Sequence, residues 1–119
     1  MINGKTILGF YLEKTVTNVI IPHAYVFSRG KYKEVTRPGW TKIILSGLSP
    51  LGDMCGGGTL LADNLQHGLV LSGGKATKID FPGSVPGSSY VNSINTRGDM
   101  VGVYQAPDLA WHGFLRTRR

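Results

Sequence analysis

The stretch HGLVLSGGKATKIDFPG, residues 67–83, decides the fold because its pattern also stands earlier in the chain. It aligns without gaps to HAYVFSRGKYKEVTRPG, residues 23–39, with seven identical positions at an offset of 44. A third copy begins at His112 as HGFLRTRR. Recurrence at a fixed period is the signature of a protein built from repeated structural units. The 119-residue chain is therefore predicted to be one domain made of repeats of about 45 residues.

The segment before each histidine repeats as well. IILSGLSPLGDMCG, residues 43–56, matches SYVNSINTRGDMVG, residues 89–102, at an offset of 46. Gly52 and Gly98 are predicted to take positive φ in equivalent tight turns, where the following aspartates hydrogen-bond nearby amides. A catalytic pair of carboxylates is the alternative interpretation of those aspartates. The strand after the second turn is expected to bury both Met100 and Val101.

Each period contains several short segments that favour strands over helices. TILGFYL, HAYVFS, KYKEVT and TKIILSG are rich in β-branched and aromatic residues and are bounded by Gly, Pro, Ser and Asn. SRGK and LSGGK are predicted hairpin turns. About four strands per period is typical of a β-propeller blade. We expect an all-β, propeller-like fold of two full repeats and a half, with roughly ten short antiparallel strands: repeat 1 at about 1–40, repeat 2 at about 41–84, and truncated repeat 3 at about 85–119.

The ordered submotifs INTRGDMVGVY, HGFL and TKIDFPG resemble the HAF-type repeats of probable extracellular bacterial proteins. The matching tripeptides begin at His23, His67 and His112. The resemblance covers almost the entire chain, implies a propeller-like β-repeat fold, and brings no catalytic residues with it. Function is not implied either, because propellers carry many activities.

Two and a half repeats are too few to close a ring of blades, so open strand edges are expected to pair with another chain. We predict a homo-oligomer, most simply two copies in one ring of about six blades with two-fold symmetry. The alternative is an open stack of sheets that stays monomeric.

Composition narrows the remaining possibilities. The formal net charge of +6 favours anionic partners, but the only basic cluster is RTRR at residues 116–119. The single cysteine, Cys55, cannot form an intrachain disulfide and is expected to be buried. No apolar run is long enough for a membrane helix, so no membrane partner is expected. The N-terminal residues lack the features of a signal peptide, which favours a cytoplasmic location as expressed. The resembled family is labelled extracellular, so the compartment stays open.

The three repeated histidines are predicted to be structural, each tying its own strand to a neighbouring loop. A zinc site is the alternative, because three imidazoles can hold that ion. No cofactor, metal site or catalytic residue is predicted. Residues that differ between repeats are expected in loops, where specificity is built. The candidate ligand-binding residues are Trp40, Arg97, Trp111 and Arg116. For Trp111, an oligomer interface, a core edge and a ligand site are all open.

The sequence thus favours a non-enzymatic binding or interaction module with an anionic or carbohydrate ligand. The alternatives are a small hydrolase acting on carbohydrate at a shared pocket, and a weak binder of anionic ligands or nucleic acid.

Overall fold

The computed structural model describes residues 2–3 and 6–117, which form eleven β-strands and no helix. The prediction of an all-β protein is confirmed. The strands form three antiparallel sheets, and none of these sheets closes on itself within the described residues. Sheet 1 contains β1 (Ile2–Asn3), β2 (Thr6–Lys14), β3 (Ile20–Ser28) and β4 (Lys31–Glu34). Sheet 2 contains β5 (Trp40–Leu48), β6 (Met54–Leu60), β7 (Leu65–Ser72) and β8 (Lys75–Ile79). Sheet 3 contains β9 (Tyr90–Ile94), β10 (Met100–Gln105) and β11 (Trp111–Arg116).

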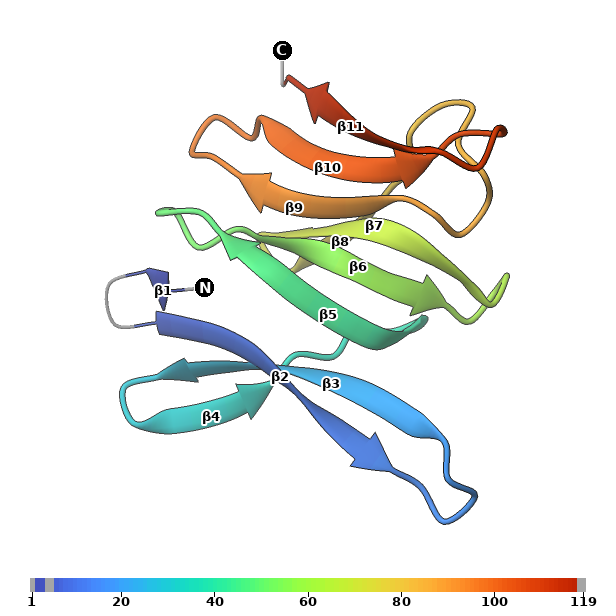
Figure 1. The fold of residues 1–119 in the computed structure, drawn as a ribbon. Helices are drawn as coiled ribbons and strands as arrows, with labels where there is room; N and C mark the ends of the chain where they lie inside the picture. The colour runs from blue at the N-terminus through green and yellow to red at the C-terminus, as the bar shows by residue number, and fades with distance from the viewer. Residues whose placement is uncertain (1, 4–5, 118–119) are drawn as a thin grey trace.

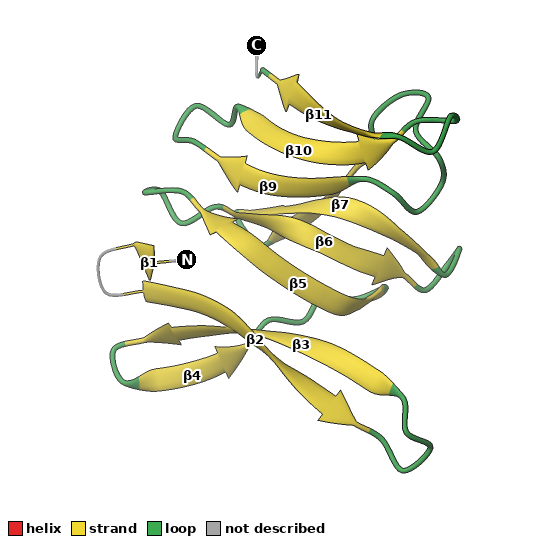
Figure 2. Ribbon diagram, viewed as in Figure 1, coloured by secondary structure: helices red, strands yellow, loops and turns green. Residues whose placement is uncertain are grey.

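The three sheets are stacked in chain order, with sheet 2 in the middle (Figure 1). Sheet 1 contacts sheet 2 mainly through β5, which lies against β2 and β3. Sheet 3 contacts sheet 2 mainly through β9, which lies against β5, β6 and β7. Loops and turns are confined to the two ends of the strands (Figure 2). In the described part of the chain, no helix has the length and apolarity needed to span a membrane.

Consecutive strands pair with each other, so every sheet is a meander. The predicted hairpins are found at β3–β4 and β7–β8. Arg29 and Gly30 have φ of 54° and 76°, and Gly73 and Gly74 have φ of 58° and 78°. Two successive residues with positive φ form the tight turn whose twist matches that of the flanking strands.

The strand register is the same in all three sheets. In each sheet, the repeated histidine lies directly opposite one residue of the preceding strand. Two positions before that residue is a glycine, which lies opposite the second residue after the histidine. The histidine pairs are Tyr11–His23, Gly58–His67 and Tyr104–His112, and the glycine pairs are Gly9–Tyr25, Gly56–Leu69 and Gly102–Phe114. The sequence alignment therefore corresponds to a structural equivalence between the sheets.

We call the face of each sheet that carries its repeated histidine the histidine face, and the opposite one the rear face. The rear face of sheet 1 packs on the histidine face of sheet 2, in a core that includes Leu8, Ala24, Leu69 and Leu71. The rear face of sheet 2 packs on the histidine face of sheet 3, in a core of Cys55, Val70, Ile79, Val91, Ile94 and Met100. Neighbouring sheets thus meet in the same orientation twice.

The expectation that Met100 and Val101 are both buried is wrong for Val101. Met100 is buried on the histidine face of sheet 3, whereas Val101 is 44% exposed on the rear face. Successive side chains of a strand point to opposite faces, so one sheet interface can cover only one of the two. The repeat-equivalent Cys55 is fully buried because sheet 3 covers it, and this confirms the prediction for that cysteine.

Gly56 and Gly102 are required by the close approach of the preceding strand. A Cβ at Gly56 would collide with the carbonyl oxygen of Ile44, and one at Gly102 with the carbonyl oxygen of Tyr90. The register of β5–β6 and of β9–β10 shifts beside these glycines, leaving one extra residue in β5 and in β9. Such bulges bend the strand locally. The recurring glycine is therefore a packing requirement of the bulged pair.

Candidate functional site

Two of the repeated histidines are held between two carboxylates. In sheet 2, His67 Nε2 lies 2.7 Å from Asp63 Oδ2, and His67 Nδ1 lies 2.8 Å from Asp80 Oδ1. Asp63 belongs to the β6–β7 turn, and Asp80 directly follows β8. The His67 ring is buried, and Trp40 packs against it edge-on at 6.4 Å. One side chain therefore joins two strands and a turn on the histidine face.

His23 repeats this arrangement in sheet 1 with acids from different positions. His23 Nε2 lies 2.7 Å from Glu13 Oε1 in β2, and Nδ1 lies 3.0 Å from Glu34 Oε2 in β4. Tyr11 stacks on the imidazole at 5.0 Å and donates its hydroxyl to Glu34. The hydrogen bonds to Glu13 and then to Glu34 raise the pKa of His23 above its usual value of 6.5.

The bonding of both ring nitrogens limits what these histidines can do chemically. A carboxylate oxygen already occupies each nitrogen of His23 and His67, so neither ring offers a free lone pair to a metal or a substrate. Among the described residues, no group of three or more His, Cys, Asp or Glu side chains is arranged to hold a metal ion. The arrangement cross-links strands.

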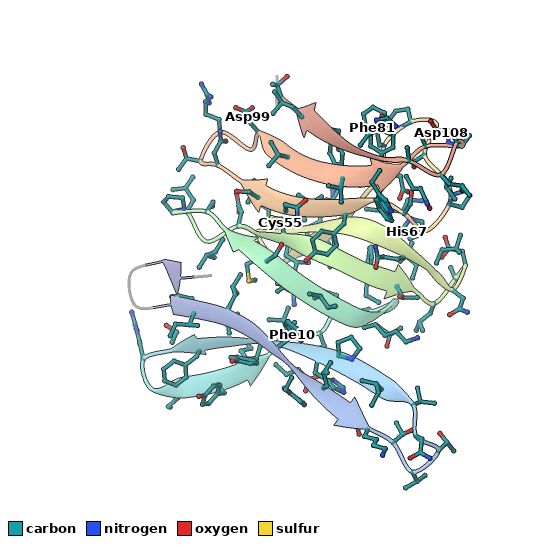
Figure 3. The ribbon with its side chains drawn as sticks, viewed as in Figure 1. Phe10, Cys55, His67, Phe81, Asp99 and Asp108 are labelled. Atoms are coloured by element: carbon teal, nitrogen blue, oxygen red, sulfur yellow. The ribbon has the colours of Figure 1, made fainter. Side chains whose placement is uncertain are left out.

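His112 in sheet 3 has a different environment. Its ring stacks on Tyr104 at 5.5 Å and is exposed. Asp108 precedes His112 by four residues, as Asp63 precedes His67, and both aspartates accept the amide N–H two residues on, at 2.9 Å. Figure 3 places Asp108 and Asp99 at opposite ends of sheet 3. No carboxylate is hydrogen-bonded to the His112 ring in the described part of the chain.

The turns at Gly52 and Gly98 are equivalent, with φ of 91° and 85°. The side chain of the residue that opens each turn binds the turn amides. Ser49 Oγ accepts from the amides of Leu51 and Asp53, and Asn95 Oδ1 accepts from the amides of Arg97 and Asp99. Short polar side chains at the first turn position reach the amides two and four residues ahead. The sequence signal for this role was the matched Ser49–Asn95 pair.

The structure does not gather the four predicted ligand-binding residues in one place. Trp40 starts β5 and packs into the core between sheets 1 and 2, whereas Trp111 starts β11 and is 61% exposed on sheet 3. Only Arg97 lies in a turn, where it pairs with Asp99 at 3.0 Å. Both tryptophans thus lie in strands and not in the loops where residues that differ between repeats are expected, and Arg116 ends β11. The last two residues of the basic cluster lie outside the described residues.

Two pockets flank the end of β11. The first has a volume of about 320 Å³ and lies between sheets 2 and 3, where Asp53, Thr77, Ile79, Gly98 and Arg116 line it. The second has a volume of about 520 Å³ and lies along Phe81, Phe114, Leu115 and Thr117. Phe81, labelled in Figure 3, follows β8 and stacks on Tyr104 of sheet 3 at 4.0 Å.

The rear face of sheet 3 is an uncovered apolar surface. One cross-strand pair occupies the same place on every rear face: Leu8–Val26, Cys55–Val70 and Val101–Leu115. Inside the stack, Leu8 is 4% and Val70 is 8% exposed, whereas Leu115 on sheet 3 is 67% exposed. Trp111 precedes Leu115 by four residues in β11, so its side chain lies on this same face.

The histidine face of sheet 1 is uncovered at the other end of the stack. Its cross-strand pair Phe27–Tyr32 is equivalent to Leu71–Ala76 in sheet 2. Leu71 is buried and Ala76 packs against the core, whereas Tyr32 is 72% exposed. Tyr25 and Phe27 pack around Tyr32, which makes this face aromatic. The two end faces are therefore the exposed equivalents of faces that pack on each other inside the chain.

A comparison with known protein families, with curated proteins and with solved structures finds no match to this chain.

Proposed function

We propose that this chain is a non-enzymatic interaction module of the HAF-repeat kind that binds a second copy of itself through its two end faces. The rear face of sheet 3 in one copy packs on the histidine face of sheet 1 in the other. Two such contacts complete a propeller-like ring of six sheets. One observation carries the proposal: positions that are buried between sheets inside the chain are exposed at both of its ends.

Burial of apolar surface supplies the driving force for this association. Leu115, Val101 and Trp111 on one face and Tyr32, Tyr25 and Phe27 on the other are large apolar or aromatic side chains. Aromatic residues are enriched at protein interfaces. Glu34, which lies opposite Tyr25 on the histidine face, is paired with His23. The same pairing of faces already packs Leu8 and Ala24 against sheet 2, where they are 4% and 1% exposed. The unlike faces make the contact heterologous, which closes into a ring when the rotation permits.

The first experiment is the native mass in solution, measured by light scattering after size exclusion. The proposal requires a mass twice the 12.9 kDa of one chain. Leu115→Arg places a charge in the contact and is expected to give monomers. Leu61→Arg is the matched control, because Leu61 is 66% exposed and lies outside both end faces. A monomeric wild-type chain, or equal effects of the two variants, would refute the proposal.

A mixing experiment tests the head-to-tail geometry. Leu115→Arg damages only the rear face and Tyr32→Arg damages only the histidine face. Each variant alone has no intact contact in a two-copy ring, but a mixed pair keeps one intact contact. Recovery of dimers on mixing is therefore expected. Dimers of either variant alone would indicate that like faces pair, and would exclude the proposed geometry.

A further inference from the structure

We infer that the free edge of β11 binds an extended peptide strand with the chemistry of β4 and β8. The equivalent strands β3 and β7 each pair on both sides, with β4 and β8 as their outer partners. In the described part of the chain, β11 pairs with β10 alone and is an edge strand. Edge strands present unpaired backbone groups that accept an added strand. The side chains of an added strand would alternate between the space that faces sheet 2 and the rear face of sheet 3.

The equivalent strand β3 shows which backbone groups of β11 point out of the free edge. In sheet 1, the amide of Val35 donates to the carbonyl of Ala24 at 2.9 Å, so the backbone of Ala24 points toward the outer strand. Alternate residues of an antiparallel strand bond to the same neighbour. The equivalents of Ala24 and Val26 are Gly113 and Leu115, whose backbone groups therefore point out of the free edge of sheet 3.

The two pockets beside β11 lie where the side chains of an added strand would pack. Between sheets 1 and 2, Ala76 of β8 packs against the core that contains Val26 and Val35. The equivalents of those valines in sheet 2 are Val70 and Ile79, and both line the 320 Å³ pocket. The 520 Å³ pocket continues past Phe114 and Leu115. The residues equivalent to Ala76 and Lys78 of β8 would face the space between sheets 2 and 3, because both pair with residues of the histidine face.

The surroundings specify which peptide fits. Val35 directly follows β4 and Ile79 ends β8; both are buried β-branched residues, and each precedes a polar residue. In sheet 2 that residue is Asp80, which binds His67 Nδ1. A peptide acid at this position would lie beside His112, the equivalent of His67 in sheet 3. The favoured ligand is an extended segment with a β-branched residue followed by an acid.

The test uses a synthetic peptide with the sequence of residues 75–83, KATKIDFPG, carrying a fluorophore at its N-terminus. The protein is the full chain with Tyr32→Arg, which removes the self-contact without touching β11. Saturable binding with one peptide per chain is expected in fluorescence anisotropy, together with slower amide exchange at Leu115. Because the Tyr32→Arg chain lacks the histidine-face contact, peptide binding is measured independently of self-association. A failure of one therefore does not imply a failure of the other.

Two N-methylated peptides provide the matched control. Methylation of the isoleucine nitrogen removes the amide equivalent to that of Val35 and is expected to weaken binding by about tenfold or more, because one hydrogen bond is lost and the methyl blocks the edge. Methylation of the preceding lysine nitrogen, which points away from β11, is expected to leave affinity within about threefold. No binding of the unmodified peptide, or equal loss with both methylated peptides, would overturn the inference.

Discussion

Gly56→Ala is predicted to destabilise the protein, whereas Gly113→Ala is predicted to be tolerated. Both glycines lie in strands and neither has positive φ. A Cβ at Gly56 would lie 2.8 Å from the Cα of Leu45 and closer still to the Ile44 carbonyl. A Cβ at Gly113 meets nothing nearer than the Gly102 carbonyl at 3.8 Å, and the equivalent residue in sheet 1 is already Ala24. The pair therefore separates steric conflict from the general effect of replacing glycine.

The size of the destabilisation by Gly56→Ala depends on which atoms must move to make room for the Cβ. Backbone atoms of β5 cannot rotate away as a side chain could, so β5 must shift from β6 beside the bulge. Overpacking a core costs about 1–3 kcal/mol, and each weakened ladder hydrogen bond about 0.5–1.5 kcal/mol. Alanine recovers roughly 0.5–1 kcal/mol of the conformational cost of glycine. The net loss in the free energy of unfolding is about 2 kcal/mol for Gly56→Ala, and Gly113→Ala is neutral to about 1 kcal/mol stabilising.

Urea unfolding followed by tryptophan fluorescence measures both values, with the Tyr32→Arg background used to keep the chain monomeric. The slope of the free energy against urea should stay constant, so the midpoint alone moves. The midpoint temperature of thermal unfolding should be lower by roughly 10 °C in Gly56→Ala. A Gly56→Ala protein within about 0.5 kcal/mol of the parent, well below the overpacking range, would refute the close-approach reasoning. Equal destabilisation by Gly113→Ala would do so as well.

Three further outcomes are expected. Burial raises the pKa of the Cys55 thiol to about 12, so alkylation in native buffer should be negligible and should become fast only in denaturant; fast native labelling would contradict the packing between sheets 2 and 3. The pKa of His23 is raised by Glu13 and Glu34, so its NMR titration midpoint should lie above 6.5; its stabilisation is present below pH 6.5 and is lost as the pH rises through the raised pKa. His23→Gln should therefore destabilise at about pH 6 and have little effect at about pH 9, and the same effect at both pH values would argue against the ion pairs. Ser49→Ala removes the acceptor for two turn amides and should cost about 1–3 kcal/mol, measured by urea unfolding against Ser72→Ala at an exposed strand end.

The sequence repeat predicts much of the fold because the residues that recur are those that every sheet needs. The hairpin glycines and the histidines recur at fixed offsets, and the structure places them at equivalent positions. The exposure of Val101 was not predictable from the repeat, because alternation assigns a residue to a face without saying whether another sheet covers that face.

The carboxylates around the histidines are predictable from the repeat only in part. Asp63 and Asp108 both stand four residues before their histidines, which is a signal in the sequence. Glu13 stands ten residues before His23 and reaches the ring across a longer β2–β3 hairpin. Glu34 and Asp80 also differ in the number of residues that separates them from their histidines, which is 11 and 13. Antiparallel pairing brings such residues together from unrelated spacings, so only the register reveals them.

The uniform orientation of the sheets has a consequence for how this architecture can change in length. Each sheet relies on its immediate neighbours, with β5 and β9 carrying most of the contacts between sheets. In such an array, stability is a sum of unit and nearest-neighbour contributions. Duplication of one 45-residue unit would therefore add a layer whose two surfaces already match those on either side, and deletion of the middle layer would bring two compatible surfaces together. Gene length can then vary by whole layers while the packing rules stay the same.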